Sequence, residues 1–366
     1  MKKEPPVLPF SCKNDNELPT RNGFGTTHKE HMKTEYRVAF LGAGRMGLTH
    51  LSNLMGVRGV KVAVVADTFL EAAQRGQAIA NAERATTDIE GAIAAADVDV
   101  VMISTPTTTH AHLLETAVRA GKPVWCEKPI AQDLAGTRRV VDLIATAGVP
   151  VQIGFMRRFD PGYAAAKRSI TEGKIGALER FQAMSCDTAP PPMSYIESSG
   201  GIFVDMFVHD LDLARFLMGE VNEVFAWGAV KVDPAFAKAG DVDTVVAVLR
   251  FASGALGTLQ GSRRAIWGYD IRTEVAGSAG KLVIEPPQKT PLATYGRFQS
   301  TVDHFESFPD RFEAAYKLEM EAFFQALRGG RPPTPSAADA LETLKVALAA
   351  TRSLREGRPV KVAEIV

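Results

Sequence analysis

The amino-acid sequence predicts an α/β fold. A doubly wound parallel sheet of the Rossmann type comes first, and a C-terminal α+β domain with a mainly antiparallel open sheet follows. Up to about residue 154, short valine-rich runs alternate with helical segments. Beyond that point, strand-like runs follow one another with turn residues between them. A length of 366 residues suits two domains of this kind.

The first domain is expected to span residues 36–153. Strands are expected at 36–42, 60–67, 98–105, 123–129 and 149–154, and helices at 45–55, 69–80, 109–121 and 133–148. Continuous apolar strands that alternate with helices are typical of a parallel sheet covered on both faces.

The second domain is expected to span residues 154–366. Strands are expected at 177–187, 222–233, 243–251, 255–263, 270–277 and 281–286, and helices at 200–217, 311–329 and 336–357. Ser253-Gly254 and the run 278–280 suit hairpin turns. The late helices are free to pack back on the first domain. A broad sheet with one face left to cover indicates a homo-oligomer.

Composition excludes several classes of protein. The chain has 42 basic and 42 acidic residues, so its charge suits neither nucleic acid nor an anionic membrane. No apolar run approaches the roughly 20 residues that span a bilayer. Three scattered cysteines without a C-x-x-C motif indicate a reducing, cytoplasmic location. Residues 1–35 are polar and lack the apolar core of a signal peptide, so we expect a disordered arm or an over-called start codon.

A glycine motif opens the first helix. Gly42, Gly44 and Gly47 form G-x-G-x-x-G between a strand and a helix, where the backbone can approach a pyrophosphate. Asp67 ends the next strand, twenty residues after Gly47, which is the place of the acid that binds an adenosine ribose. Thr68 follows, with no Arg or Lys beside it. The sequence therefore predicts a dinucleotide site that favours NAD over NADP.

The segment GGIFVDMFVHDLDLARFL, residues 200–217, carries charge in an apolar setting. On a regular helix, Asp205, His209 and Asp212 lie at i, i+4 and i+7 and share one stripe. Burying such groups without partners costs several kcal/mol. The pattern alone leaves three interpretations open: a proton-transfer site, a satisfied structural pair, and a metal site.

Lys128 lies in CEKPI, at the end of another predicted strand. The carboxyl ends of parallel strands face the cofactor crevice, so Lys128 is expected to face the reacting centre. Taken alone, the motif favours an ordinary surface lysine at a strand end.

With these motifs in place, the chain resembles the glucose–fructose oxidoreductase, inositol dehydrogenase and rhizopine catabolism family from about Tyr36 to the C-terminus. The resemblance is carried by GAGRMG, ADT, CEKPI, QIGFMRRFDPGY and GGIFVDMFVHDLDLARF. Three further stretches resemble the inositol 2-dehydrogenases within it: APPPMSYIESSGG, WGYDIRTEVAG and DRFEAAYKLEMEAF. One departure is Cys186, where close relatives carry Arg, and it leaves the particular polyol open.

The resemblance implies a set of site residues. The expected catalytic residues are Lys128, Asp205 and His209. The expected substrate-binding residues are these three with Arg157, Asp187, Asp212 and Tyr269. The positions expected to bind NAD are Gly42, Ala43, Gly44, Arg45, Met46, Gly47, Asp67, Thr105, Pro106, His110, Glu127 and Lys128. No metal is expected, and the resemblance implies a homotetramer.

The implied activity is the NAD-dependent oxidation of a cyclitol, most simply myo-inositol to its 2-keto product. His209 would be the general base because the pKa of histidine lies near neutrality. Asp205 would fix its tautomer, and Lys128 would stabilise the developing alkoxide. Alternative substrates are scyllo- and chiro-inositol, glucose and levoglucosan. A non-catalytic NAD-binding regulator is the alternative from another class.

Overall fold

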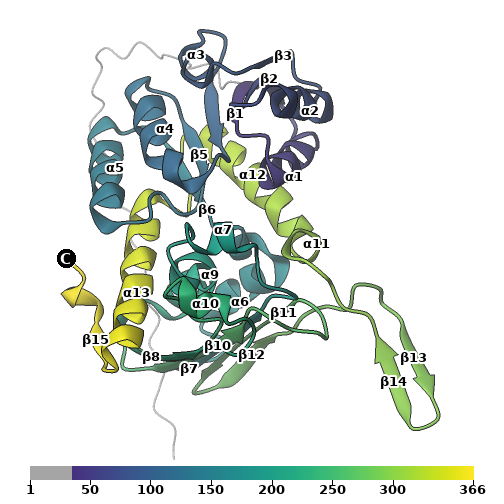
Figure 1. Ribbon diagram of the computed structural model, residues 1–366, viewed down its shortest axis with the longest axis vertical. Helices are drawn as coiled ribbons and strands as arrows, with labels where there is room; N and C mark the ends of the chain where they lie inside the picture. The colour runs from purple at the N-terminus through teal and green to yellow at the C-terminus, as the bar shows by residue number, and fades with distance from the viewer. Residues whose placement is uncertain (1–34) are drawn as a thin grey trace, which may run out of the picture. The chain divides into compact units, whose positions relative to one another are not determined.

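The computed structural model describes residues 35–366. The arm expected at residues 1–35 therefore lies, apart from its last residue, outside the described residues. In the rest of the chain the structure confirms the predicted fold class: a six-stranded parallel sheet, followed by a mostly antiparallel one (Figure 1).

The first sheet has the strand order β3-β2-β1-β4-β5-β6, and all its pairs are parallel. Its strands are β1 (Tyr36–Leu41), β2 (Val60–Ala66), β3 (Arg84–Thr86), β4 (Val100–Ile103), β5 (Val124–Glu127) and β6 (Val151–Gly154). Its helices are α1 (Arg45–Leu54), α2 (Leu70–Ala80), α3 (Ile89–Ala94), α4 (Thr107–Arg119) and α5 (Leu134–Ala147). Sequence reasoning missed β3 and α3, because neither is long enough to give a periodic signal.

Helices cover both faces of this sheet, as a doubly wound fold requires. Buried residues of α3, α4 and α5 share one core cluster with the strands, and those of α1 and α2 share another. The second cluster also contains Met320, Phe323 and Phe324 of α12 (Glu313–Arg328), a helix from the C-terminal part of the chain. Strand order reverses between β1 and β4, and ligands bind at such a switch point.

The second sheet has the order β12-β11-β7-β10-β9-β8-β15. Its strands are β7 (Leu178–Cys186), β8 (Val221–Ala229), β9 (Thr244–Phe251), β10 (Leu256–Ser262), β11 (Asp270–Gly277), β12 (Gly280–Ile284) and β15 (Val360–Lys361). The hairpins between β9 and β10 and between β11 and β12 lie at the predicted turns. The pair β7–β10 is the parallel exception.

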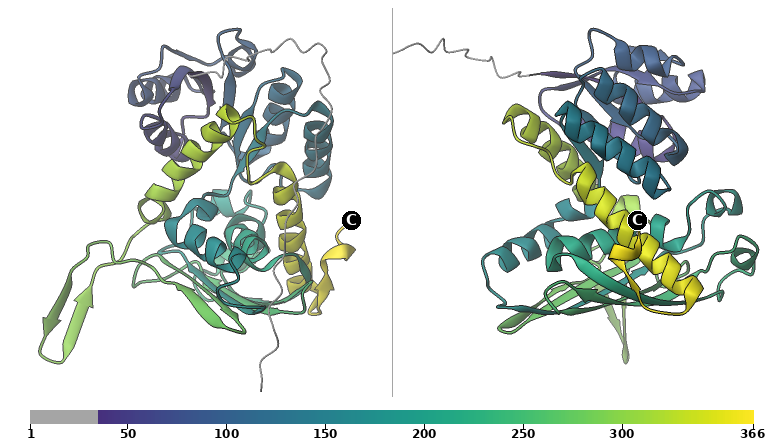
Figure 2. Two further views of the ribbon diagram at one scale, coloured as in Figure 1. Left: turned by 180° about the vertical axis from the view of Figure 1, so that it is seen from behind. Right: turned by 90° about the vertical axis from the view of Figure 1, so that its left-hand side faces the viewer.

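Among residues 35–366, helices lie on one side of the second sheet, and its other side is bare of them in the right-hand view (Figure 2). The helical segments are η1 (Met156–Phe159), α6 (Pro161–Thr171), α7 (Met193–Ile196), α8 (Ile202–Asp205), α9 (Val208–Met218), α10 (Ala235–Lys238), α11 (Phe308–Arg311), α13 (Ala337–Glu356) and η2 (Val362–Glu364). A separate hairpin of β13 (Ala293–Gly296) and β14 (Gln299–Val302) stands apart from the sheet.

Local signals define the ends of α13, which packs on β8 and α9. Ser336 and Asp339 form a capping box, in which the Ser336 Oγ accepts the Asp339 amide at 3.1 Å and the Asp339 Oδ2 accepts the Ser336 amide at 2.8 Å. The helix ends at Gly357, whose φ of 64° is readily adopted by glycine.

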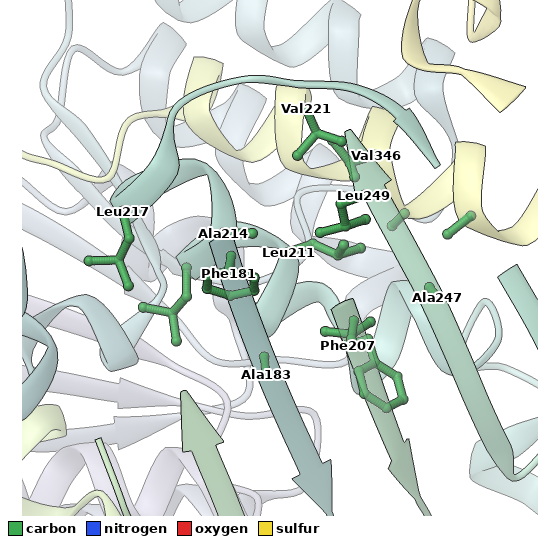
Figure 3. Packing of buried hydrophobic residues seen from close by; sticks show 14 of the residues in the cluster. Phe181, Ala183, Phe207, Leu211, Ala214, Leu217, Val221, Ala247, Leu249 and Val346 are labelled. Atoms are coloured by element: carbon green, nitrogen blue, oxygen red, sulfur yellow. The ribbon is translucent and has the colours of Figure 1, made fainter. Parts of the chain in front are cut away.

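The core of the second domain lies between α9 and the sheet. Phe207, Leu211 and Ala214 face Phe181 of β7 and Leu249 of β9 (Figure 3). Truncating a phenylalanine in such a core costs about 3–5 kcal/mol of stability. This packing fixes the helix that carries His209.

The predicted continuous helix over 200–217 is wrong. The segment forms α8 and α9, separated at Met206 and Phe207. The Phe207 amide donates to the Ile202 carbonyl, five residues back, at 3.1 Å. This wider turn changes the register, so Asp205 and His209 do not lie on one regular helical stripe. The Asp205 carbonyl, which would accept the His209 amide in a continuous helix, accepts Lys128 Nζ at 3.0 Å instead.

Candidate active site

The glycine loop between β1 and α1 has the shape that a dinucleotide needs. Gly42 has a φ of +92°, and a Cβ there would lie 2.5 Å from the Ser104 carbonyl oxygen. A Cβ at Gly47 would lie 2.0 Å from the Gly42 carbonyl oxygen. By contrast, a Cβ at Gly44 would meet no atom within 4 Å, so the loop faces open space at the start of α1. A pyrophosphate fits there, beside the helix N-terminus.

Asp67 lies beside this loop. Its Oδ2 accepts the Ala43 amide at 2.7 Å, and its Oδ1 accepts the Phe69 amide at 2.9 Å. Each carboxylate oxygen keeps lone-pair capacity for a ribose hydroxyl. These residues therefore suit the adenosine half of NAD.

The remaining predicted cofactor residues divide into two groups. Gly44, Arg45 and Pro106 are exposed, and Met46 and Thr105 are half-buried. His110 is 1% exposed, and its ring nitrogens face the Pro129 and Thr105 carbonyls at 2.8 Å each. It thus links the loops that follow β4 and β5. Glu127 Oε1 pairs with His50 Nε2 at 2.7 Å, and its Oε2 accepts the Lys128 amide at 3.1 Å.

Replacing Asp67 with serine is expected to weaken NAD use and relieve the block against NADP, because a 2′-phosphate would meet like charge beside a carboxylate. Thr68 is exposed, so Thr68→Arg in the same variant should help NADP further; Ala43 is 1% exposed and unsuited to a basic side chain. The readout is the NAD/NADP ratio of kcat/KM, with Asp142→Ser on the exposed face of α5 as control. If Asp67→Ser leaves this ratio unchanged, or if the wild type prefers NADP, then Asp67 does not bind the ribose.

Lys128, Asp205 and His209 lie close to one another, next to the glycine loop. Lys128 follows β5 and binds the Asp205 carbonyl, and His209 lies in the first turn of α9. The His209 Nδ1 is enclosed without a hydrogen-bond partner among the described residues, whereas Nε2 is not enclosed. Nε2 is therefore the nitrogen that a substrate hydroxyl can reach. The ring packs edge-on against Phe155, with 6.1 Å between centroids.

The electrostatics keep His209 neutral. Burial, and then the positive charges of Lys128 and Arg157, hold the pKa of His209 well below its ordinary value of 6.5. The expectation of a pKa near neutrality is therefore wrong. A lowered pKa means that the unprotonated imidazole, the form that accepts a proton, is the resting form at neutral pH.

The Asp205 carboxylate does not bond to His209, contrary to expectation. Its Oδ1 accepts the Tyr195 hydroxyl at 2.6 Å, and its Oδ2 accepts Arg263 Nη2 at 2.7 Å. The wider turn at Met206 and Phe207 explains this, because it changes the direction in which Asp205 leaves the helix.

Sequence reasoning missed Arg263, although a signal existed. It comes directly after β10, whose last residue pairs with Cys186 of β7, so Arg263 and Asp187 leave neighbouring strand ends together. Arg263 Nη1 donates to Asp187 Oδ2 at 3.3 Å. The predicted residue Asp187 is thus brought beside Asp205.

Arg157 and Tyr269 lie in an adjoining buried network. Arg157 Nη1 donates to Asp210 Oδ1 at 2.9 Å, and Nη2 donates to the Tyr269 hydroxyl at 3.4 Å. Ser185 Oγ donates to both oxygens of Asp210 at 2.7 Å. Arg157 is 3% and Tyr269 is 6% exposed, so this network is buried.

Asp212 is not brought into the group. Its carboxylate accepts hydrogen bonds from Arg158 Nη2 at 2.6 Å and from Arg158 Nε at 2.8 Å. Asp212 is 1% exposed. The expected contact with a substrate hydroxyl is therefore unsupported, because the carboxylate is buried in an ion pair with Arg158. Among residues 35–366, no group of three or more His, Cys, Asp or Glu is placed to hold a metal ion.

A parallel sheet with this glycine loop and with Lys128 after β5, joined to a second domain whose helices α8 and α9 carry Asp205 and His209, is the architecture of an NAD-binding oxidoreductase. Residues 36–155 match a family model described as "Oxidoreductase family, NAD-binding Rossmann fold", and residues 167–362 match its "C-terminal alpha/beta domain". The chain belongs to this Gfo/Idh/MocA oxidoreductase family, which confirms the resemblance carried by the motifs.

Curated relatives match nearly the whole described chain. An inositol 2-dehydrogenase of Rhizobium meliloti is 41% identical over 330 residues, which cover 89% of this chain and 99% of the relative. A myo-inositol 2-dehydrogenase of Thermotoga maritima is 38% identical, with coverage of 90% and 99%. The structure of a scyllo-inositol dehydrogenase from Lactobacillus casei with bound NAD(H) and scyllo-inositol superposes with a TM-score of 0.84 at 29% identity, covering 90% and 99%.

No helix in the part of the chain that the structure describes is both long and apolar enough to cross a membrane.

Proposed function

We propose that this protein oxidises a secondary hydroxyl of a cyclitol to a ketone with NAD as the oxidant, and that myo-inositol is converted to its 2-keto product. One observation carries the proposal: Lys128, the neutral His209 and the paired carboxylates of Asp187 and Asp205 meet beside the glycine loop. The names of the relatives support the choice of a cyclitol.

The chain's residues divide the work of alcohol oxidation. NAD, when bound, supplies the acceptor for the hydride that leaves the carbinol carbon. His209 Nε2 takes the hydroxyl proton, because its lowered pKa leaves it unprotonated. The Lys128 ammonium donates to the reacting oxygen and stabilises negative charge as the proton leaves. The O–H and C–H bonds break and a C=O bond forms, so the products are a ketone, reduced cofactor and a protonated imidazole.

Charge pairing favours a neutral polyol over a sugar acid or a phosphate. The two arginines beside the expected substrate residues already face carboxylates: the pairs are Arg157–Asp210 and Arg263 with Asp187 and Asp205. Of Lys128, Arg157 and Arg263, Lys128 is thus the one without a carboxylate partner in these pairs. A carboxylate or phosphate substrate would meet this one cation and the like charges of Asp187 and Asp205, which is unfavourable.

A panel of alcohols tests the proposal. Reduction of NAD would be followed with myo-, scyllo- and chiro-inositol, glucose and levoglucosan. We expect the highest kcat/KM with myo-inositol, and scyllo-inositol is the first alternative because a relative's structure contains it. If only glucose or levoglucosan is oxidised, the substrate is a sugar and not a cyclitol. NAD binding without turnover of any compound would favour the non-catalytic regulator.

We further propose that copies of the chain associate through the bare face of the second sheet, to form the homotetramer implied by the family. On β8 and β9, Val224 and Ala247 point to the core, whereas Trp227 and its register partner Val246 point outward and are 58% and 45% exposed. Val248 and Leu256 add to this apolar strip. A contiguous exposed strip of this kind marks an interaction surface. The buried free thiols of Cys126 and Cys186 suit a cytoplasmic location.

Replacing Trp227 with glutamate is expected to lower the molar mass in solution, because the charge would be buried at the centre of the strip. Light scattering after size-exclusion chromatography measures this. Ile79→Glu, an exposed position on α2 of the first domain, is the matched control and should leave the mass unchanged. If the Trp227→Glu variant keeps the wild-type molar mass, the interface between copies does not lie on this strip.

A further inference from the structure

Arg263 is more enclosed than the two carboxylates that it binds. The side chain of Arg263 is 4% exposed, whereas those of Asp205 and Asp187 are 10% and 24% exposed. The guanidinium is therefore the least accessible member of this group, and the surface that a ligand can reach belongs to the carboxylates. A hydroxyl-rich ligand would find acceptors there, with Lys128 beside them as the donor.

Asp205 is held at three points. Lys128 binds its carbonyl oxygen at 3.0 Å, Tyr195 donates to Oδ1 at 2.6 Å, and Arg263 donates to Oδ2 at 2.7 Å. The partners come from the end of β5, from α7 and from the end of β10. Asp205 is fixed from three separate elements, so its carboxylate has one orientation toward the crevice.

We propose that Arg263 is a positioning residue for the alcohol oxidation: it holds Asp187 and Asp205 together as an ionised pair whose free edges accept hydrogen bonds from neighbouring hydroxyls of the substrate ring. Without a cation between them, two carboxylates this close would repel and one would take a proton. The inference rests on the proposed function, since it assigns the pair to the hydroxyls beside the one that is oxidised.

The charges around the pair give the sign of the expected pH effect. Lys128 and Arg263 lower the pKa of Asp205 against burial, and Tyr195 adds to this by its hydrogen bond. Burial raises the pKa of Asp187, the charge of Asp205 also raises it, and Arg263 and Arg157 lower it. His209 on α9 is neutral and adds no charge. Removing Arg263 must therefore raise both carboxyl pKa values, so both acceptors are lost at a higher pH.

Three variants test the proposal: Arg263→Met, Arg263→Lys and the double variant Arg263→Met/Asp187→Asn. For Arg263→Met we expect KM for the cyclitol to rise about tenfold to a hundredfold, the worth of hydrogen bonds to a charged group. The acid limb of kcat/KM should move to higher pH, while the Kd of NAD stays unchanged. Arg263→Lys keeps the charge, so its acid limb should stay near that of the wild type, with a raised KM.

The double variant separates charge from packing. Asp187→Asn removes the like charge, so it should return the acid limb of Arg263→Met toward the wild-type position. If the Arg263 variants fail to fold, Asp187→Asn alone should move the acid limb to lower pH. An Arg263→Met enzyme with KM and pH profile within about twofold of the wild type would overturn the proposal, as would a limb that Arg263→Met and Arg263→Lys shift equally.

Failure of the proposed function is distinguishable. If the wild type oxidises no cyclitol, that function fails, but carboxyl ¹³C chemical shifts of aspartate-labelled protein still report the titration of Asp205 and Asp187. Their pKa values should rise in Arg263→Met. Unchanged carboxyl titrations would overturn the role of Arg263 whatever the substrate is.

Discussion

Replacing His209 with alanine is expected to lower kcat by about 10²–10⁴-fold, the usual worth of a general base. The affinity for NAD should barely change, because the glycine loop and Asp67 lie on a different element. Steady-state kinetics with the substrate selected by the panel, together with NAD titration, measure both.

His112→Ala is the matched control, since His112 is an exposed histidine of α4 paired with Glu90. It should retain wild-type turnover. The lowered pKa of His209 also gives the direction of the pH dependence. Because the imidazole stays neutral as the pH falls, the loss of kcat/KM through its protonation should occur below pH 6.5. A His209→Ala enzyme with near-normal turnover would contradict the assignment of the base.

Replacing Lys128 with methionine is expected to lower kcat by roughly 10²–10³-fold, the cost of removing one donor to a developing oxyanion. The chain length is nearly kept, so the change removes mainly the ammonium group. It also frees the Asp205 carbonyl that Lys128 binds. The measurement is the separation of kcat from KM.

Lys174→Met, at an exposed lysine paired with Glu172, is the control and should change neither constant. If Lys128→Met raises KM and leaves kcat intact, Lys128 positions the substrate and does not stabilise the transition state.

Signals that depend on backbone shape were readable from the sequence. Gly42 and Gly47 stand where a Cβ would collide with backbone, so the glycine motif and its helix could be placed by residue type alone. Asp67 and Lys128 directly follow β2 and β5, and the ends of parallel strands meet at one edge. These positions needed only the order of strands and helices.

Features that depend on long-range packing were not readable. The break at Met206 and Phe207 lies in an apolar run without Gly or Pro, so periodicity predicts an unbroken helix. That assumption placed Asp205 on one stripe with His209, whereas the structure directs the Asp205 carboxylate to Tyr195 and Arg263. Asp212 does share α9 with His209, but its carboxylate pairs with Arg158, 54 residues away. The partners of Asp205 are 10 and 58 residues away, and no local pattern indicates which side chains fold back on it.

The hairpin of β13 and β14 was missed for a related reason. Its strands have four residues each, most of them exposed, so neither apolar alternation nor a buried run marks them. Tyr295 and Phe298 are 81% and 95% exposed at this hairpin. A pattern method that looks for a buried face cannot detect a strand pair that has none.

The most direct test of the central claim is the fate of the hydrogen on the oxidised carbon. The enzyme would be incubated with NAD and myo-inositol deuterated at C2, and the reduced cofactor and the ketone would be analysed by mass spectrometry. The account predicts one deuterium in the reduced cofactor and a ketone at C2, because the hydride leaves the same carbon whose hydroxyl loses its proton to His209. Reduced cofactor without deuterium, or no reduced cofactor at all while NAD binds, would contradict it.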